Sequence, residues 1–392
     1  MLRSLYSGIS GLQSQQTMLD TTANNIANVN TVGFKSSSVE FEDTLSQTLS
    51  NPTTPTAGVG GTNGGQVGLG VRVAGVTKNL VEGSAQTTGD DKDMMINGDG
   101  YFPVSVNGRT EYTRDGAFSL DTAGNLVTAD GGIVQGWPAV NGAVNNGGIP
   151  QGLNIRVGQM SQPQATSTAT VTGNLPSDAA NGTVLNRDIT VYNANGAESQ
   201  LSLAFTKTAA GWNVATSDSG GATAAQALTF TNGQLTAPTT VTSASGIAVN
   251  LAAATDYAGT TTAGISGQNG FAAGTLQSFT VSSDGTLQGT FSNGQIQPIG
   301  QVALATFSNP EGLVADGNSN FSASTNSGVA QYGVAGSAGF GSITGGALEQ
   351  SNVDLSQEFT NLIIAQRAFQ ASARVVTTSD QILQQLDQLQ SS

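Results

Sequence analysis

The N-terminal segment, residues 1–30, places apolar residues at the spacing of an α-helix. The apolar positions recur in steps of three and four, and this period puts them on one helical face, as in the a/d seam of a coiled coil. This N-terminal seam consists of Leu2, Leu5, Ile9, Leu12, Leu19, Ala23 and Ile26, with Gln16 as its polar member. The pattern predicts a helix over residues 2–28 that stops before Gly33, a residue suited to a cap or a turn.

A second helical pattern occupies the opposite end of the sequence. Its apolar residues step by four and three as far as residue 376, and the register then drifts without ending the helix. This C-terminal seam consists of Leu355, Phe359, Leu362, Phe369, Ala373, Val376, Ile382, Leu386 and Leu389, with Gln366 as its polar member. Asn352 or Asp354 is suited to the N-cap.

Both terminal helices need a partner, because an isolated helix with one apolar face is marginal in water. One interpretation is that they pair with each other as a stalk within one chain. The other is that they pack between copies in a polymer. Small residues on the first helix (Gly8, Gly11, Ala23 and Ala27) would permit close approach. The polymer is favoured because the remaining faces carry amides and hydroxyls, whereas a solvent-exposed stalk usually carries more charge.

Between the helices the sequence changes to short apolar runs separated by Asn-Gly and Asp-Gly pairs, which supply the positive φ of tight hairpins. Residues 72–157 therefore predict an antiparallel β domain, with a core of Ile96, Phe102, Val104, Tyr112, Phe118, Leu120, Leu126, Val134 and Trp137. Residues 158–274 predict a second β domain. Its segment 236–262 has few large apolar residues, so a thin core is expected there.

Residues 34–71 are expected to connect the first helix to the β domains. Their first part, residues 36–49, predicts either a short helix or an extended arm, and residues 51–70 are rich in Gly, Pro, Thr and Asn, which is typical of a linker. Such a segment could equally serve as a hinge or as a contact arm between subunits.

The predicted fold is multidomain, with paired, coiled-coil-like terminal helices enclosing two mainly antiparallel β domains. The predicted domains are a terminal helical polymerisation domain (1–33 plus 350–392), a linker or extended arm (34–71), an inner β domain (72–157 plus 275–349) and an outer β domain (158–274). In this organisation the chain runs outward and returns, so that its two end helices meet.

Composition limits the chemistry that the chain can perform. The 392 residues carry a formal net charge of −14 and include no cysteine and no histidine. Acidic charge without a basic cluster disfavours nucleic acid and anionic membranes as partners. Without histidine and cysteine, the usual ligands of zinc and the usual acid–base and nucleophilic groups are missing. We therefore expect no catalytic residue, no cofactor and no metal site, and the chain is not expected to be an enzyme.

Three further patterns limit the possible functions. An acidic cluster at residues 90–99 fails the spacing of an EF-hand loop, because the fifth position counted from Asp91 is Met95. No stretch reaches the roughly 18 apolar residues of a membrane span. After Arg3 no apolar run of about seven residues marks a secretory signal peptide.

The two ends of the sequence resemble the bacterial flagellar rod and hook protein family. The most specific match is residues 23–35, ANNIANVNTVGFK, in which the family motif residues are Asn24, Asn25, Ala27, Asn28, Asn30, Gly33 and Phe34. Residues 351–376 are similar to the closing helix of the same family, and residues 96–137 to the first β domain shared by its hook and distal rod members. The resemblance covers about half of the chain.

The resemblance implies a structural function and no chemistry. The length of the chain favours a hook-forming member, which would polymerise into a curved, flexible tube that links the rod to the filament and encloses the export channel. It implies the chain itself as the main partner, with rod, hook-cap and hook–filament junction proteins and the flagellar export apparatus as others. It also implies an extracellular location after export without a cleaved signal. The alternatives are a distal rod or junction protein and, from another class, a secreted β-rich carbohydrate-binding protein.

Overall fold

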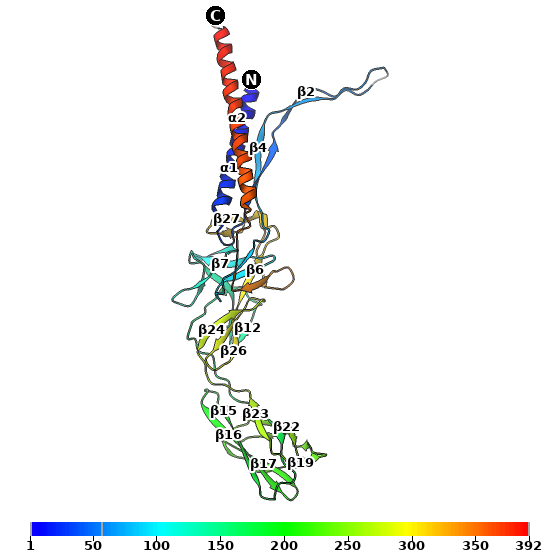
Figure 1. Ribbon diagram of the computed structural model, residues 1–392, viewed down its shortest axis with the longest axis vertical. Helices are drawn as coiled ribbons and strands as arrows, with labels where there is room; N and C mark the ends of the chain where they lie inside the picture. Colours follow the sequence, from blue (N-terminus) through cyan, green and yellow to red (C-terminus); the bar gives the residue numbers. More distant parts are fainter. Residues whose placement is uncertain (1, 56–57, 391–392) are drawn as a thin grey trace. The chain divides into compact units, whose positions relative to one another are not determined.

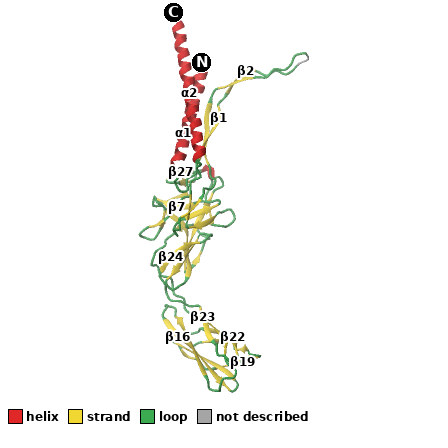
Figure 2. Ribbon diagram, viewed as in Figure 1, coloured by secondary structure: helices red, strands yellow, loops and turns green. Residues whose placement is uncertain are grey.

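The structure is a computed structural model that describes residues 2–55 and 58–390. Its two long helices come from opposite ends of the sequence and pack side by side (Figures 1 and 2). Helix α1 spans Leu2–Ala27 and helix α2 spans Leu355–Gln390. They run antiparallel, because Ser4 near the start of α1 lies against Ser379 near the end of α2.

The predicted ends of both helices agree with the structure. Helix α1 stops at Ala27, and Gly33 beyond it has a φ of +67°, in the left-handed region that glycine tolerates. At the start of α2, the Oδ1 atom of Asp354 accepts a 2.8 Å hydrogen bond from the backbone N–H of Ser356, so Asp354 is the N-cap. Asn352, the other candidate, has a different role described below.

The segment after α1 is made of strands. Strand β1 (Ser37–Asp43) pairs antiparallel with β4 (Val71–Lys78), and β2 (Ser46–Ser50) pairs antiparallel with β3 (Gly65–Gly68). Figure 1 shows β2 within a narrow two-stranded ribbon. The alternative of a short helix over residues 36–49 is therefore wrong, and β3 lies within the stretch predicted to be a linker.

The chain divides into two units. The first comprises Met1–Ile155, Thr280–Gln288 and Pro298–Ser392, and the second comprises Arg156–Phe279 and Gly289–Gln297. Each unit has β-sheet structure of its own (Figure 2). Strands β24 (Leu276–Val281) and β25 (Thr286–Phe291) contain residues of both units, as does β26 (Ile296–Thr306), whose first two residues belong to the second unit.

Besides the helices and β1–β4, the first unit contains the strands that we call the inner β body. They are β5 (Ala85–Thr87), β6 (Met94–Asn97), β7 (Phe102–Val106), β8 (Arg109–Thr113), β9 (Ser119–Leu120), β10 (Leu126–Val127), β11 (Ile133–Val140), β12 (Ala143–Val144), β13 (Gln151–Gly152), β26 (Ile296–Thr306), β27 (Val314–Gly317), β28 (Asn320–Ser322), β29 (Gln331–Val334), β30 (Ser342–Gly345) and β31 (Ala347–Glu349). Its main sheet has the order β26-β11-β7-β8-β28-β27, while β6 pairs with β30 and β5 with β31. These pairings are antiparallel.

The core of the inner β body follows the sequence pattern. Eight of the nine predicted core residues are buried, and Leu120 is partly buried. Asn107 (φ 50°) and Gly108 (φ 80°) form the tight turn between β7 and β8, as their Asn-Gly sequence predicts.

The second unit is a sheet of ten strands. They are β14 (Thr168–Asn174), β15 (Val184–Tyr192), β16 (Glu198–Thr208), β17 (Gly211–Asp218), β18 (Gly221–Ala222), β19 (Gln226–Thr231), β20 (Gln234–Ala237), β21 (Thr240–Thr242), β22 (Ala248–Thr255) and β23 (Gly264–Gln268). Its strand order is β15-β16-β17-β19-β20-β22-β14-β23. The pairing of β14 with β22 is parallel and the other pairings are antiparallel.

The core of the second unit is larger than the sequence suggests. Trp212, Leu203 and Phe205 are completely buried at its centre. The segment 236–262, where a thin core is expected, also contributes to it, because Val249 and Leu251 are completely buried. Val249 and Leu251 alternate with the exposed Asn250 on β22, and they belong to the same cluster as Phe205 of β16 and Trp212 of β17.

A substitution in this core tests its contribution. Replacing Leu203 by Ala removes a buried side chain and leaves a cavity, so the free energy of unfolding should fall by about 2–5 kcal/mol. Urea unfolding followed by the fluorescence of Trp212 would measure the change. Val184→Ala is the control, because Val184 on the adjacent strand β15 is 51% exposed and should change stability by less than about 0.5 kcal/mol. Equal effects of the two substitutions would contradict this description of the core.

Candidate functional site

The two helices approach each other closely because glycines line their contact. A Cβ atom on Gly8 would lie 3.1 Å from Cγ2 of Val376, and one on Gly11 would lie 3.1 Å from Oγ of Ser372. Both distances are shorter than ordinary van der Waals contact, so a larger side chain at either position would push the helices apart. The proposed role of Gly8 and Gly11 in close approach therefore has a geometric basis, whereas Ala23 and Ala27 are exposed.

The N-terminal seam does not form the most buried face of α1. The most buried described residues of α1 are small or polar, namely Gly8, Ser14, Thr22 and Asn25. Seam residues Leu5, Leu12, Leu19 and Ile26 are partly buried, and Ile9 and Ala23 are exposed, while the side chain of Leu2 lies outside the described part. Small residues let the backbones come together, so the larger seam residues flank the contact instead of filling it.

The C-terminal seam is also placed only in part against α1. Leu362, Phe369, Ala373 and Val376 are partly buried, Leu355, Phe359 and Ile382 are exposed, and the side chains of Leu386 and Leu389 lie outside the described part. Among the described side chains of α2, the buried ones are Ala365 and Ser379, which the seam does not include. A four-and-three spacing is compatible with more than one helical face, and the close contact between the helices uses a face of smaller residues.

The family motif fastens the end of α1 to the start of α2. Asn25 is 1% exposed, and its Nδ2 donates to Oε1 of Glu358 (3.0 Å) and to the backbone oxygen of Ser37 (2.8 Å). Its Oδ1 accepts a 3.0 Å hydrogen bond from the backbone N–H of Ser37. One amide side chain therefore connects α1, β1 and α2. Asn352 acts similarly, because its Oδ1 accepts a 2.8 Å bond from the backbone N–H of Ser36 and its Nδ2 donates to the backbone oxygen of Asn79.

A buried ion cluster lies beside this connection. Glu349 is completely buried, with Nζ of Lys35 at 2.6 Å and Nη1 of Arg114 at 3.5 Å from its carboxylate oxygens. Burial lowers the pKa of Lys35 below its ordinary value, although the Glu349 carboxylate opposes that shift. The carboxylate also accepts a 2.9 Å hydrogen bond from the backbone N–H of Gly83. These three charges join the segment after α1, the strand before α2 and the inner β body.

Gly33 lies in the same junction. Its backbone N–H donates a 2.8 Å hydrogen bond to the backbone oxygen of Glu349, and a Cβ added to it would lie 2.7 Å from the backbone nitrogen of Asp115. The positive φ and the lack of space both require glycine.

Of the other motif residues, Asn28 donates from Nδ2 to the backbone oxygen of Asn24 (2.9 Å). Phe34 is partly buried, and Ala27 and Asn30 are exposed.

Glu349 and Arg114 were not among the predicted site residues. Charged residues make up only 10% of the chain, and Lys35 lies within the family motif segment, residues 23–35. These two observations could have marked Lys35 as a candidate for a specific structural role. The pairing of Lys35 with Glu349, which is 314 positions away in the sequence, is seen only in the folded structure.

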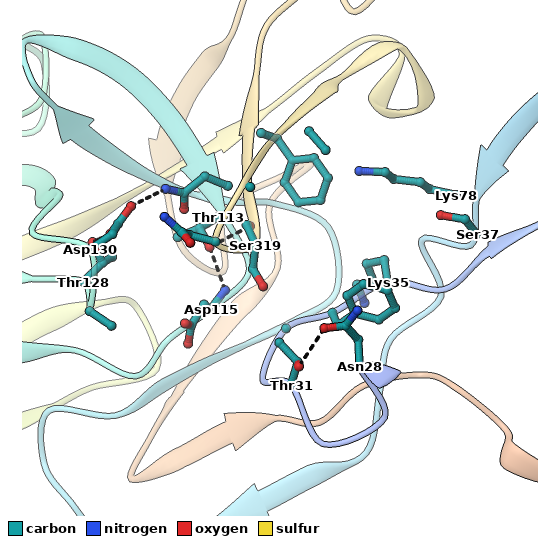
Figure 3. Close-up of a pocket in the computed structure, with 18 of the residues that line it drawn as sticks. Asn28, Thr31, Lys35, Ser37, Lys78, Thr113, Asp115, Thr128, Asp130 and Ser319 are labelled. Atoms are coloured by element: carbon teal, nitrogen blue, oxygen red, sulfur yellow. Dashed lines mark hydrogen bonds between the residues drawn. The ribbon is translucent and has the colours of Figure 1, made fainter. Parts of the chain in front are cut away.

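A cavity of about 880 Å³ opens next to the junction, between the end of α1 and the inner β body (Figure 3). Its wall includes Asn28, Thr31, Lys78, Asp115 and Phe321. Burial raises the pKa of the Asp115 carboxyl group above its ordinary value. The wall contains both hydrogen-bond donors and acceptors, together with the apolar surface of Phe321.

The structure offers no metal centre within residues 2–55 and 58–390, since no group of three or more acidic residues there could hold an ion. Asp90 of the acidic cluster pairs instead with Lys92, whose Nζ lies 2.7 Å from its Oδ1. Neither of the described helices is long and apolar enough to cross a membrane.

Three models of flagellar protein families match the sequence. The match of residues 5–35 is described as "Flagella basal body rod protein", that of residues 95–195 as "Flagellar hook protein FlgE/F/G D1 domain", and that of residues 344–389 as "Flagellar basal body rod FlgEFG protein C-terminal". The first and third matches include the two helices and the family motif.

Curated relatives match over the full length. The chain is 36% identical to the flagellar hook protein FlgE of Borreliella burgdorferi, with 99% of this chain and 100% of the relative aligned. It is 36% identical to FlgE of Escherichia coli (96% and 98%) and 32% identical to the flagellar basal-body rod protein FlgG of Bacillus subtilis (98% and 98%). Its fold resembles the crystal structure of the Helicobacter pylori flagellar hook protein FlgE2, with a TM-score of 0.50, 12% identity, and coverage of 68% of this chain and 100% of that one.

The close helix contact predicts a strong effect of Gly11→Leu. A leucine side chain at Gly11 cannot fit against Ser372, so the helix pair should separate and the helical circular dichroism at 222 nm should melt at a lower temperature. Gln13→Leu introduces the same residue at an exposed position of α1 and should leave the melting unchanged. The contact would be wrongly described if the two variants melted alike.

The ion cluster predicts a large cost for Glu349→Gln. Removing the carboxylate leaves Lys35 and Arg114 buried without their anion, so the free energy of unfolding should fall by about 3–5 kcal/mol. Glu42→Gln is the matched control, because Glu42 forms an exposed ion pair with Arg72 that should contribute no more than about 1 kcal/mol. Urea unfolding followed by circular dichroism would compare them, and a loss below 1 kcal/mol for Glu349→Gln would argue against a structural role of the cluster.

Proposed function

Because the chain belongs to the family of bacterial flagellar hook and rod proteins, we propose that it polymerises into a curved, flexible tube. In this proposal the tube joins the rod to the filament and encloses the export channel. The chain is a structural subunit of the flagellar hook, with a role in motility, and is not an enzyme. Membership of the family also supports self-association and association with rod and filament components.

The observation that carries the proposal is the set of apolar side chains left exposed on α2. We call Leu355, Phe359 and Ile363 the first apolar row, because they follow one another at four-residue spacing and are 39–51% exposed. Ile364, Val375 and Ile382 form the second apolar row, spaced by three and two helical turns and 45–55% exposed. A helix that is already paired on one side and still exposes two apolar rows is suited to contacts with neighbouring copies.

The seams predicted from the sequence fit this arrangement as assembly surfaces. Leu355, Phe359 and Ile382 belong to the C-terminal seam, and Ile9 of the N-terminal seam is 42% exposed. We propose that the partly buried seam residues stabilise the antiparallel helix pair as a coiled-coil-like unit, while the exposed ones contact other copies. Fully burying one such side chain contributes about 1.5–3 kcal/mol.

The ribbon of β2 and β3 is a second candidate assembly surface. Leu45 is 83% exposed, Leu49 63% and Val67 43%, and an isolated two-stranded ribbon is marginally stable in water. We therefore propose that this segment is a contact arm between subunits, which is one of the roles that its sequence suggests.

The domain roles follow from the same proposal. Residues 1–33 and 350–392 would form the polymerisation domain, with 34–71 as the arm. Residues 72–157 with 275–349 would form an inner β domain and 158–274 an outer one. The family motif would act mainly inside the subunit, because Asn25 and Gly33 are buried in the junction and hold the helix pair on the inner β body.

The partners and the location are proposed on the same basis. Besides its own copies, the subunit would contact rod, hook-cap and hook–filament junction proteins and would leave the cell through the flagellar export apparatus without a cleaved signal. A distal rod or junction role remains the second candidate, because the similarity to a basal-body rod protein FlgG is also full-length.

Electron microscopy of the purified full chain tests the proposal. The wild-type chain should form curved tubes when concentrated, whereas Phe359→Asp combined with Ile363→Asp should abolish assembly because it puts two carboxylates into the first apolar row. Gln370→Asp combined with Gln381→Asp adds the same charge at exposed polar positions and should assemble. Circular dichroism would verify that both variants fold.

Two outcomes would change the assignment. Straight rods from the wild-type chain would favour the rod candidate. Tubes from the Phe359/Ile363 variant would show that the first apolar row is not an assembly surface.

A further inference from the structure

The cavity beside the helix junction contains a cation whose charge is not balanced by a carboxylate. Lys78 ends strand β4, lines the cavity and is partly buried. Its Nζ lies 4.0 Å from the centroid of the Phe321 ring. Within the described part of the chain, no carboxylate oxygen lies within 4.0 Å of that nitrogen.

The environment of Lys78 differs from that of four other cations of the first unit. Lys35, Arg72, Lys92 and Arg114 each form an ion pair with a glutamate or aspartate. Burial alone lowers the pKa of Lys78, without an opposing carboxylate. The ring of Phe321 attracts the ammonium group, but an aromatic face compensates for lost water only partly. A desolvated, unbalanced cation that faces a cavity is a candidate binding group.

The acidic residues of the cavity wall already have partners of their own. Oδ1 of Asp115 accepts a 3.0 Å hydrogen bond from the backbone N–H of Ala117, and Oδ2 of Asp130 accepts a 2.8 Å bond from Nδ2 of Asn320. Figure 3 shows Asp115 and Asp130 on the side of the cavity opposite Lys78. The Lys78 end of the cavity is therefore the end suited to an anion.

The rest of the wall suits a peptide better than a small ion. The volume of about 880 Å³ is within the range of roughly 300–1,000 Å³ typical of pockets for larger ligands. The wall includes Asn24, Thr31 and Ser319, whose amide and hydroxyl groups can bond to the backbone of an extended segment. An inorganic anion would use only a small part of this surface.

We propose that the cavity receives a carboxylate side chain from a second copy of this chain, which forms an ion pair with Lys78. The inference deepens the proposed function, on which it rests. Charge favours this occupant, because the chain has 26 acidic and only 12 basic residues, so neighbouring copies present an excess of carboxylates. Each such pair would reduce the repulsion between subunits of net charge −14.

An assembly assay with matched variants tests the role of the charge. Lys78→Met keeps an unbranched stem of similar length against Phe321 but removes the charge, and it should raise the concentration needed for polymer formation about tenfold, equivalent to about 1.4 kcal/mol. Lys78→Arg retains the charge and should restore assembly to within about threefold of wild type. Lys92→Met removes the same charge from an exposed ion pair and should assemble like wild type.

Carbodiimide cross-linking of polymers made from ¹⁴N and ¹⁵N subunits tests the partner. The reagent activates a carboxylate, the amine of Lys78 attacks the activated carbonyl carbon, an amide bond forms, and the carboxylate oxygen leaves in the urea by-product. Cross-linked peptides that contain Lys78 and combine both isotopes would support pairing between copies. Cross-links of Lys78 within single-isotope peptides alone, or none at Lys78, would overturn it.

The outcomes separate the two proposals. A wild-type chain that forms no polymer overturns both. If the wild-type chain polymerises and Lys78→Met assembles at the same concentration as Lys92→Met, only the role of the cavity is overturned. Urea unfolding of the unassembled Lys78→Met chain should match wild type, and a large loss of stability would assign Lys78 to the fold instead of to assembly.

Discussion

The arrangement of the first unit depends on the interactions of one buried carboxylate, that of Glu349. It lies where three segments meet: the chain leaving α1, the strand entering α2 and the inner β body. Lys35 and Arg114 share this one anion, and Asn25 connects the same segments through neutral hydrogen bonds. Because buried charges and amides tolerate little displacement, this junction fixes the direction in which the helix pair leaves the β body.

The helix pair uses different side chains for the contact between its own two helices and for the proposed contacts with other subunits. Its own interface is made close by Gly8 and Gly11 and contains hydroxyl and amide groups, whereas large apolar side chains such as Phe359 and Ile364 remain exposed on α2. A subunit with this division can keep its helices together through small residues and reserve its larger apolar side chains for association. In the proposed assembly, such a reserve would let one subunit pack against several neighbours at once.

The sequence predicted the local features and the pairing of the two terminal helices, but it did not predict which residues make the long-range contacts. The helix ends, the Asp354 cap and the glycine turn at Gly33 depend on neighbouring residues, and each agrees with the structure. The face of each helix that meets the other was predicted only in part, because a three-and-four spacing does not reveal that small residues will make the closest contact. The partners of Glu349 could not be predicted, since nothing in the local sequence of Lys35 or Arg114 indicates a residue hundreds of positions away.

The pairing of the two chain ends has a consequence for the order of events during synthesis. Helix α1 is synthesised before the β units and α2 after them, and their contacts join residues as far apart as Ser4 and Ser379, 375 positions in the sequence. A nascent chain that has not yet reached residue 349 lacks both the partner helix and the buried carboxylate. The β units can therefore form before α2 has been synthesised, but the helix pair forms only once α2 is present and the chain closes a loop of this length.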